Sequence, residues 1–166
     1  MKRSFAIVLF LCFSAALFLD VAVAAAEQGK YKVRYQSGYR QWAHVKSMVI
    51  EEGHPLYDSF GGIHHIYANK KALKALKSGT PYPKGSVFVF DLLQAVDGEN
   101  AVTEGERRFV GLMQKDPKKF ASTGGWGFEA FKGDTRERVV KDGGQSCFQC
   151  NESQKGTEYV FTKHRK

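Results

Sequence analysis

The chain has 166 residues, of which 43% are hydrophobic, and it carries a formal net charge of +8 at pH 7. This length is within the usual range of one domain. The basic excess favours an anionic surface, an acidic protein or a small anion as partner. The sequence contains no recognised nucleic-acid-binding motif, so we do not expect nucleic acid among the partners.

The chain begins with a segment that has the features of a signal peptide. A basic start at residues 2–3 precedes an apolar run over residues 5–19, and small residues then offer a cleavage bond after Ala24 or Ala26. The run is too short for a comfortable membrane span. We therefore expect residues 1–26 to be removed and residues 27–166 to be periplasmic or secreted, with no membrane span. An uncleaved anchor is the alternative.

The first half of the mature chain predicts helices and short strands. Residues 39–50 carry apolar side chains at helix-like and mixed spacing, which predicts an early helix that runs into a strand. A short strand is predicted over residues 63–68. Asn69 is a good N-cap for a helix over residues 70–77, because Ala72, Leu73 and Leu76 share one face of it and the lysines share the other.

The second half predicts mainly strands. Residues 86–93 form a nearly continuous apolar run, which is typical of a strand covered on both faces. Further strands are predicted over residues 108–114 and 125–131, and a last strand over residues 158–162. Early helices followed by an antiparallel meander predict an α+β fold.

The most informative stretch is Cys147-Phe148-Gln149-Cys150-Asn151. It resembles the C-x-x-C-H motif of c-type haem attachment, in which two thiols add across the haem vinyl groups and the histidine ligates the iron. Here Asn151 stands in the histidine position, and an amide is a poor iron ligand. The third cysteine, Cys12, lies in the apolar run near the start and is expected to leave with the signal peptide.

Several other short segments accompany this motif in a characteristic order, and together they resemble the cytochrome P-460 family, which includes the beta-sheet cytochromes c-prime. The resemblance covers residues 39–165. It implies a largely antiparallel sheet with a few helices, a homodimer, and a haem c whose open distal face handles hydroxylamine or nitric oxide. The segments are Tyr39-Arg40-Gln41-Trp42, Gly85-Ser86-Val87, Lys119-Phe120-Ala121, Gly125-Trp126-Gly127-Phe128, the cysteine pair and Tyr159-Val160-Phe161-Thr162.

Carried over residue by residue, the resemblance places Cys147 and Cys150 on the thioether cysteines and Asn151 on the proximal histidine. In hydroxylamine-oxidising members, a lysine cross-linked to the porphyrin falls on Phe90, and a carboxylate that moves protons falls on Met113. A phenyl ring cannot form the cross-link, and a thioether cannot act as a base. The resemblance therefore implies the gas-binding branch, and we expect the family's oxidation of hydroxylamine to be lost.

The same positions also have ordinary structural interpretations. Met113 is suited to filling gaps in a core, and Phe90 can share one core with Phe88, Trp126, Phe128 and Phe131. No histidine shows a recognised metal-binding spacing, and each is expected at the surface. His64 and His65 would point to opposite faces of a strand. The histidines are His44, His54, His64, His65 and His164.

Three hypotheses follow for the cysteine pair. The first is a degenerate haem c site, with iron held by water, by a displaced histidine or weakly by Asn151. The second is a haem-free structural or binding module in which Cys147 and Cys150 form a disulfide, as close pairs do in exported proteins. The third is a thiol-disulfide oxidoreductase. That motif normally opens a helix near the start of a βαβ unit, so its place near the end of the chain ranks this hypothesis last.

Overall fold

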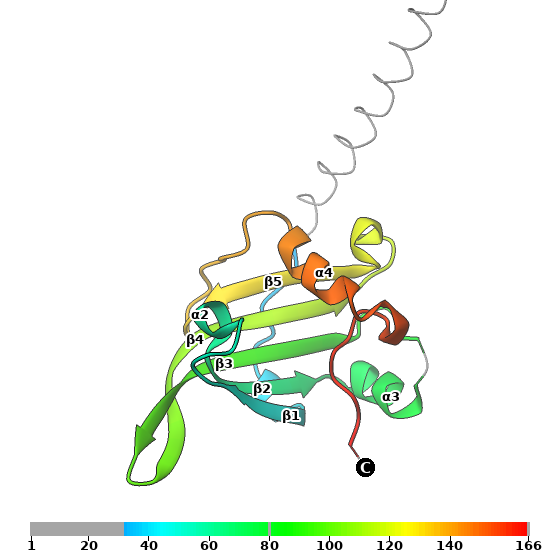
Figure 1. The fold of residues 1–166 in the computed structure, drawn as a ribbon. Helices are drawn as coiled ribbons and strands as arrows, with labels where there is room; N and C mark the ends of the chain where they lie inside the picture. Colours follow the sequence, from blue (N-terminus) through cyan, green and yellow to red (C-terminus); the bar gives the residue numbers. More distant parts are fainter. Residues whose placement is uncertain (1–31, 80, 166) are drawn as a thin grey trace, which may run out of the picture.

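Five antiparallel strands lie side by side in the order β1-β2-β3-β4-β5 in the computed structural model, which describes residues 32–79 and 81–165 (Figure 1). The predicted signal peptide and Cys12 lie outside these residues. No helix in the described part of the chain is long and apolar enough to cross a membrane. The elements are η1 (Tyr39–Gln41), β1 (Ala43–Ile50), α2 (Tyr57–Phe60), β2 (Gly62–Ala68), α3 (Lys70–Ser78), β3 (Val87–Gly98), β4 (Ala101–Lys115), η2 (Ala121–Thr123), β5 (Trp126–Lys132), α4 (Gln145–Glu152) and η3 (Lys155–Thr157).

The predicted α+β fold is confirmed, and so are the strands predicted before residue 132. The early helix is only the single 3-10 turn η1, after which β1 begins. Strands β3 and β4 run beyond their predicted ends into a hairpin that extends past the rest of the sheet (Figure 1). Glu99 and Asn100 at its tip have φ of 50° and 63°, the left-handed conformations that a two-residue hairpin turn requires.

Asn69 is the N-cap of α3, as the sequence predicted. Its Oδ1 accepts hydrogen bonds from the backbone N–H of Ala72 at 2.9 Å and from that of Val87 at 3.2 Å, and its Nδ2 donates to the Gly85 carbonyl at 2.9 Å. One side chain thus begins the helix and also fixes it to the start of β3.

One prediction near the C-terminus is wrong, and one helix there was missed. Residues 158–162 form no strand, because Glu158 and Tyr159 have φ of 52° and 67°, which interrupts an extended backbone. The Glu158 carbonyl instead accepts a hydrogen bond from Trp126 Nε1 at 2.9 Å, and its carboxylate contacts Lys115 Nζ at 3.1 Å. Helix α4, which carries the cysteine pair, had not been predicted.

The sheet separates two cores, because successive side chains of a strand point to opposite faces. Helices α2 and α4 lie on one side of the sheet, which we call the helix face (Figure 1). Residues 32–38, the lead-in segment, pass behind the sheet on its other side, the lead-in face (Figure 1). The helix face carries Val45, Ala68, Ala72, Phe88, Trp126, Phe128, Phe148 and Val160, and the lead-in face carries Val33, Tyr39, Val87, Val89, Val110, Leu112, Phe120 and Phe131. The expectation of one aromatic core was therefore wrong, since Phe131 lies across the sheet from Trp126 and Phe128.

A buried carboxylate connects the lead-in segment to the sheet. Asp91 on β3 has a fully buried side chain, and it accepts hydrogen bonds from the Tyr39 hydroxyl at 2.7 Å, from Arg107 Nε at 2.6 Å and from Arg40 at 3.1 Å. Burial, together with the hydrogen bond to Asp91, raises the pKa of Tyr39 well above its ordinary value, so the hydroxyl remains a donor. The cluster thereby holds η1 and the lead-in against the sheet.

We predict that Asp91→Ala lowers the free energy of unfolding by about 3 kcal/mol, because it leaves the buried arginine and tyrosine groups without their shared acceptor. Urea denaturation measures the change. Asp97→Ala, on the exposed end of the same strand, is the matched control and should change stability by less than about 0.5 kcal/mol. Equal effects of the two substitutions would contradict the role assigned to Asp91.

Candidate functional site

The cysteine pair lies on α4, and two features fix where this helix begins. Gly143 and Gly144 have φ of 68° and 92°, and a Cβ on Gly144 would lie 2.9 Å from Phe128 Cβ, so only glycine allows α4 to approach β5 this closely. The carboxylate of Asp142 accepts from the backbone N–H of Gly144 at 2.9 Å and from that of Ser146 at 2.8 Å. These two bonds satisfy amides at the start of the helix.

Helix α4 packs on the helix face through Phe148. This ring is buried, and its centroid lies 6.4 Å from that of Phe128 and 5.2 Å from that of Tyr159. Cys147 is partly buried against the same core, whereas Cys150, one helical turn later, is exposed, and both are free thiols. Burial of Cys147, and then the nearby Asp142 carboxylate, raises the pKa of its thiol. The two thiols therefore differ in accessibility, and the pKa of Cys147 lies above that of an ordinary thiol.

Asn151 is directed back onto its own helix. Its Nδ2 donates a 2.7 Å hydrogen bond to the Cys147 carbonyl, and the residue is only partly buried. The amide thus has a local partner, and it offers no imidazole nitrogen beside the two thiols. The structure brings all three predicted residues of the motif together on one helix.

The two other predicted site residues share the face on which α4 lies. Met113 on β4 pairs with Phe88 and Phe128 and packs against the same core as Cys147. Phe90 on β3 lies opposite Gly111, one same-face cross-strand pair nearer to α2 than the Phe88–Met113 pair, and it is half-buried. Its ring centroid lies 6.1 Å from that of Phe60 and 5.7 Å from that of Phe109. An apolar, incompletely covered surface therefore extends from the cysteines toward α2.

His64 lies on this face and corrects the prediction that every histidine is at the surface. It is fully buried, and its ring centroid lies 4.6 Å from that of Phe90. Its Nε2 is 2.5 Å from the Phe60 carbonyl, and its Nδ1 has no hydrogen-bond partner. Burial lowers the pKa of His64, which favours the neutral ring. His65 points to the opposite face, as predicted. The sequence signal for burial of His64 was its two-residue spacing from Ile66, which places both on one face of β2.

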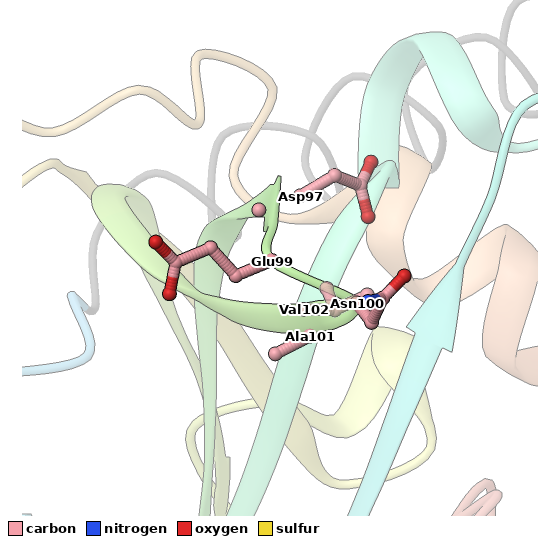
Figure 2. Close-up of a pocket in the computed structure, with 6 residues that line it drawn as sticks. Asp97, Glu99, Asn100, Ala101 and Val102 are labelled. Carbon is pink, nitrogen blue, oxygen red and sulfur yellow. The ribbon is translucent and has the colours of Figure 1, made fainter.

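Two hollows in the structure lie at the β3–β4 hairpin and not at the cysteines. One, of about 290 Å³, is formed by residues 97–102, and Figure 2 shows the carboxylates of Asp97 and Glu99 pointing away from each other. The other, of about 660 Å³, lies between the hairpin and residues 49–62, with Arg108 in its wall. Within the described residues, no group of three or more His, Cys, Asp or Glu side chains is arranged to hold a metal ion.

The arrangement fits covalent attachment of a flat apolar group better than it fits metal ligation by the motif. Cys147 and Cys150 place two sulfur atoms one turn apart on a short helix: Cys147 packs against the same core as Met113, Cys150 is exposed, and the half-buried Phe90 lies on the same face of the sheet. Asn151, in the position where an axial imidazole is needed, has the wrong donor chemistry. The thiols therefore suit a haem c, and residue 151 does not suit its iron.

One comparison with known proteins bears on this site. A family model described as Cytochrome P460 matches residues 36–162, which include η1, all five strands and α4. No curated protein matches the chain. The matched range contains each site residue described above.

We predict that, in the reduced protein without an attached group, iodoacetamide alkylates Cys150 several-fold faster than Cys147. Cys150 is exposed, while burial shields Cys147 and raises the pKa of its thiol, which leaves less thiolate at any given pH. Peptide mapping follows each thiol separately. Repetition in urea is the control and should make the two rates equal. Faster alkylation of Cys147 in the folded protein would contradict the geometry of α4.

Proposed function

The chain belongs to the cytochrome P460 family, and we propose that it is an exported mono-haem c protein of this family that binds small nitrogen-oxide ligands and does not oxidise hydroxylamine. The family implies a haem cofactor. The observation that carries the proposal is the placement of Cys147 and Cys150 on one helix, against the sheet face that also presents Phe90 and Met113. A periplasmic or secreted location and a homodimer are parts of the same proposal.

Attachment would rest on the thiols of this chain. Cys147 and Cys150 would form the two thioether bonds, and the half-buried apolar side chains of Phe90 and Met113 would contact the porphyrin. When bound, haem supplies an iron centre that can take up nitric oxide. Thioether bonds hold a porphyrin whatever the strength of the axial ligand, so a weak ligand at residue 151 does not by itself exclude a haem protein.

Axial ligation is the weak part of the site. The Asn151 amide already donates to the Cys147 carbonyl, so the iron would be held by water, by a displaced histidine or weakly by the amide oxygen. His64 shares the sheet face and has an unpartnered Nδ1, but its ring is fully buried and its Nε2 contacts the Phe60 carbonyl. A histidine ligand would therefore require movement of a side chain or of α2.

Oxidation of hydroxylamine requires groups that remove protons as electrons leave. Phe90 has no nitrogen for a cross-link to the porphyrin, and Met113 offers a thioether where a base is needed. The side chains around Phe90 are also poor bases: Phe60 and Phe109 are apolar, and His64 is buried with a lowered pKa. These residues favour ligand binding over multi-electron chemistry.

The second candidate is a haem-free module with a Cys147–Cys150 disulfide. Two observations favour it: Phe128, Phe148 and Tyr159 already pack together around α4, and Asn151 is satisfied without a metal. A thiol-disulfide oxidoreductase is less well supported. Such enzymes depend on an acidic, accessible thiol, whereas Cys147 is partly buried and its pKa is raised.

We predict that the full chain, expressed in a host that matures c-type cytochromes, acquires a covalent haem. The expected observations are a Soret band and an intact mass that includes one haem. Cys147→Ala combined with Cys150→Ala is the control and should give a colourless protein of unchanged secondary structure. A colourless wild-type protein that is two protons lighter than its reduced form would instead establish the disulfide module.

We further predict that Asn151→His raises the haem loading several-fold in the same host, because it restores the axial imidazole beside the thioether cysteines. The ratio of Soret to protein absorbance measures loading. Gln149→His is the matched control, since it places an imidazole on the same helix at an exposed position outside the histidine position of the motif, and it should change nothing. No gain from Asn151→His would mean that the apolar surface beside α4 does not accept the porphyrin.

A further inference from the structure

A chain of hydrogen-bonded polar side chains lies on the lead-in face, across the sheet from the cysteines. Ser47 Oγ on β1 is 2.7 Å from His65 Nδ1 and 2.8 Å from His44 Nε2. His65 Nε2 on β2 is in turn 2.6 Å from Glu104 Oε1 on β4. Ser47 and His65 are direct partners in the β1–β2 ladder, so the register of the sheet fixes their approach.

The Glu104 carboxylate determines which atom donates in each of these hydrogen bonds. Glu104 can only accept when ionised, so the neutral form of His65 that fits this contact has its proton on Nε2 and a lone pair on Nδ1. The Ser47 hydroxyl then donates to Nδ1, and its oxygen accepts from the Nε2–H of His44. A serine hydroxyl directed at an imidazole that is oriented by a carboxylate is the arrangement that activates a nucleophile.

The surroundings of these hydrogen-bonded side chains hold His65 in place and leave Ser47 accessible. The His65 side chain is only 18% exposed, and its ring makes an edge contact with that of His44 at a centroid distance of 5.6 Å. The His44 ring also contacts that of Tyr67, again at 5.6 Å. Ser47 is exposed on β1, the edge strand of the sheet. The base is thus held in place, while the hydroxyl is accessible from solvent.

We propose that Ser47 is the nucleophile of an acyl-transfer site for small carboxylic esters, with His65 as general base and Glu104 as the residue that positions His65. Ser47 is exposed, so a small ester can reach its hydroxyl directly from solvent. The site shares no residue with the cysteine helix, so it stands or falls independently of haem binding.

The reaction balances within these residues and the ester. Ser47 Oγ attacks the carbonyl carbon while its proton passes to His65 Nδ1. The alkoxide leaves with that proton, which gives an acylated Ser47 and an alcohol. Water then attacks the acyl carbon with His65 again taking a proton, and release of the carboxylic acid restores the serine hydroxyl. No oxidant, reductant or metal takes part.

The test uses a fluorophosphonate probe, which reacts with activated serines by loss of fluoride, on the full chain. We expect one probe per molecule, located by peptide mapping at Ser47, and slow release of p-nitrophenolate from p-nitrophenyl acetate. Ser47→Ala should abolish the labelling, and His65→Ala should slow it about 100-fold or more, which is the usual contribution of a general base. Ser37→Ala, at an exposed serine of the lead-in segment, is the matched control and should label normally.

Glu104 is tested by a pair of variants. Glu104→Gln should slow the labelling about tenfold or more, because it no longer favours the Nε2–H form of His65, whereas Glu104→Asp should retain part of the rate. Thermal unfolding of each variant confirms that the fold is intact. No labelling of the wild-type protein, labelling spread over several serines, or equal rates in the wild type and His65→Ala would overturn the proposal.

Discussion

The two-residue period of the antiparallel sheet is the constraint on which the rest of this structure depends. Neighbours in one strand are assigned to opposite sides, so Phe90 lies on the helix face while Asp91, the next residue, is buried among the arginines of the lead-in face. His64 and His65 are separated in the same way. Each side of the sheet therefore has its own chemistry, although the residues that make it are adjacent in the sequence.

In the proposed function, three positions act in one direction. The resemblance to the family implies that Asn151 stands in place of an imidazole, Phe90 of an amine and Met113 of a carboxylate, and that each of the three replaced groups would bind iron or move protons. On this proposal, the pair of thiols and the apolar surface would hold a porphyrin and a small neutral ligand without catalysing proton-coupled oxidation. Phe90 and Met113 lie on the same face of the sheet, and helix α4, which carries Asn151, packs on that face through Phe148.

Much of the fold was predictable, because periodicity and capping are local signals. The Asn69 cap, α3 and the strands before residue 132 follow from patterns within ten or so residues. The strand predicted over residues 158–162 failed because Glu158 and Tyr159 adopt left-handed backbone conformations. Neither residue is a glycine, so nothing in the sequence indicates such a conformation. For the candidate site, the resemblance to the family predicted the cysteines, Asn151, Phe90 and Met113, and these roles stay predictions. The sequence could not predict the Ser47 chain, whose links join residues 18 and 39 positions apart.

The two faces are physically coupled through β2. His64 packs on Phe90, so a group bound over Phe90 would press on the strand that carries His65 on its other side. The coupling is limited by Asp91, which lies opposite His65 on β3 and is held by Arg107 and by the Tyr39 hydroxyl. A buried, fully hydrogen-bonded carboxylate resists movement, so β3 is held in place, and its pairing with β2 limits the displacement of His65. The lead-in face can therefore keep an ordered serine–histidine–carboxylate chain whether or not the helix face is loaded.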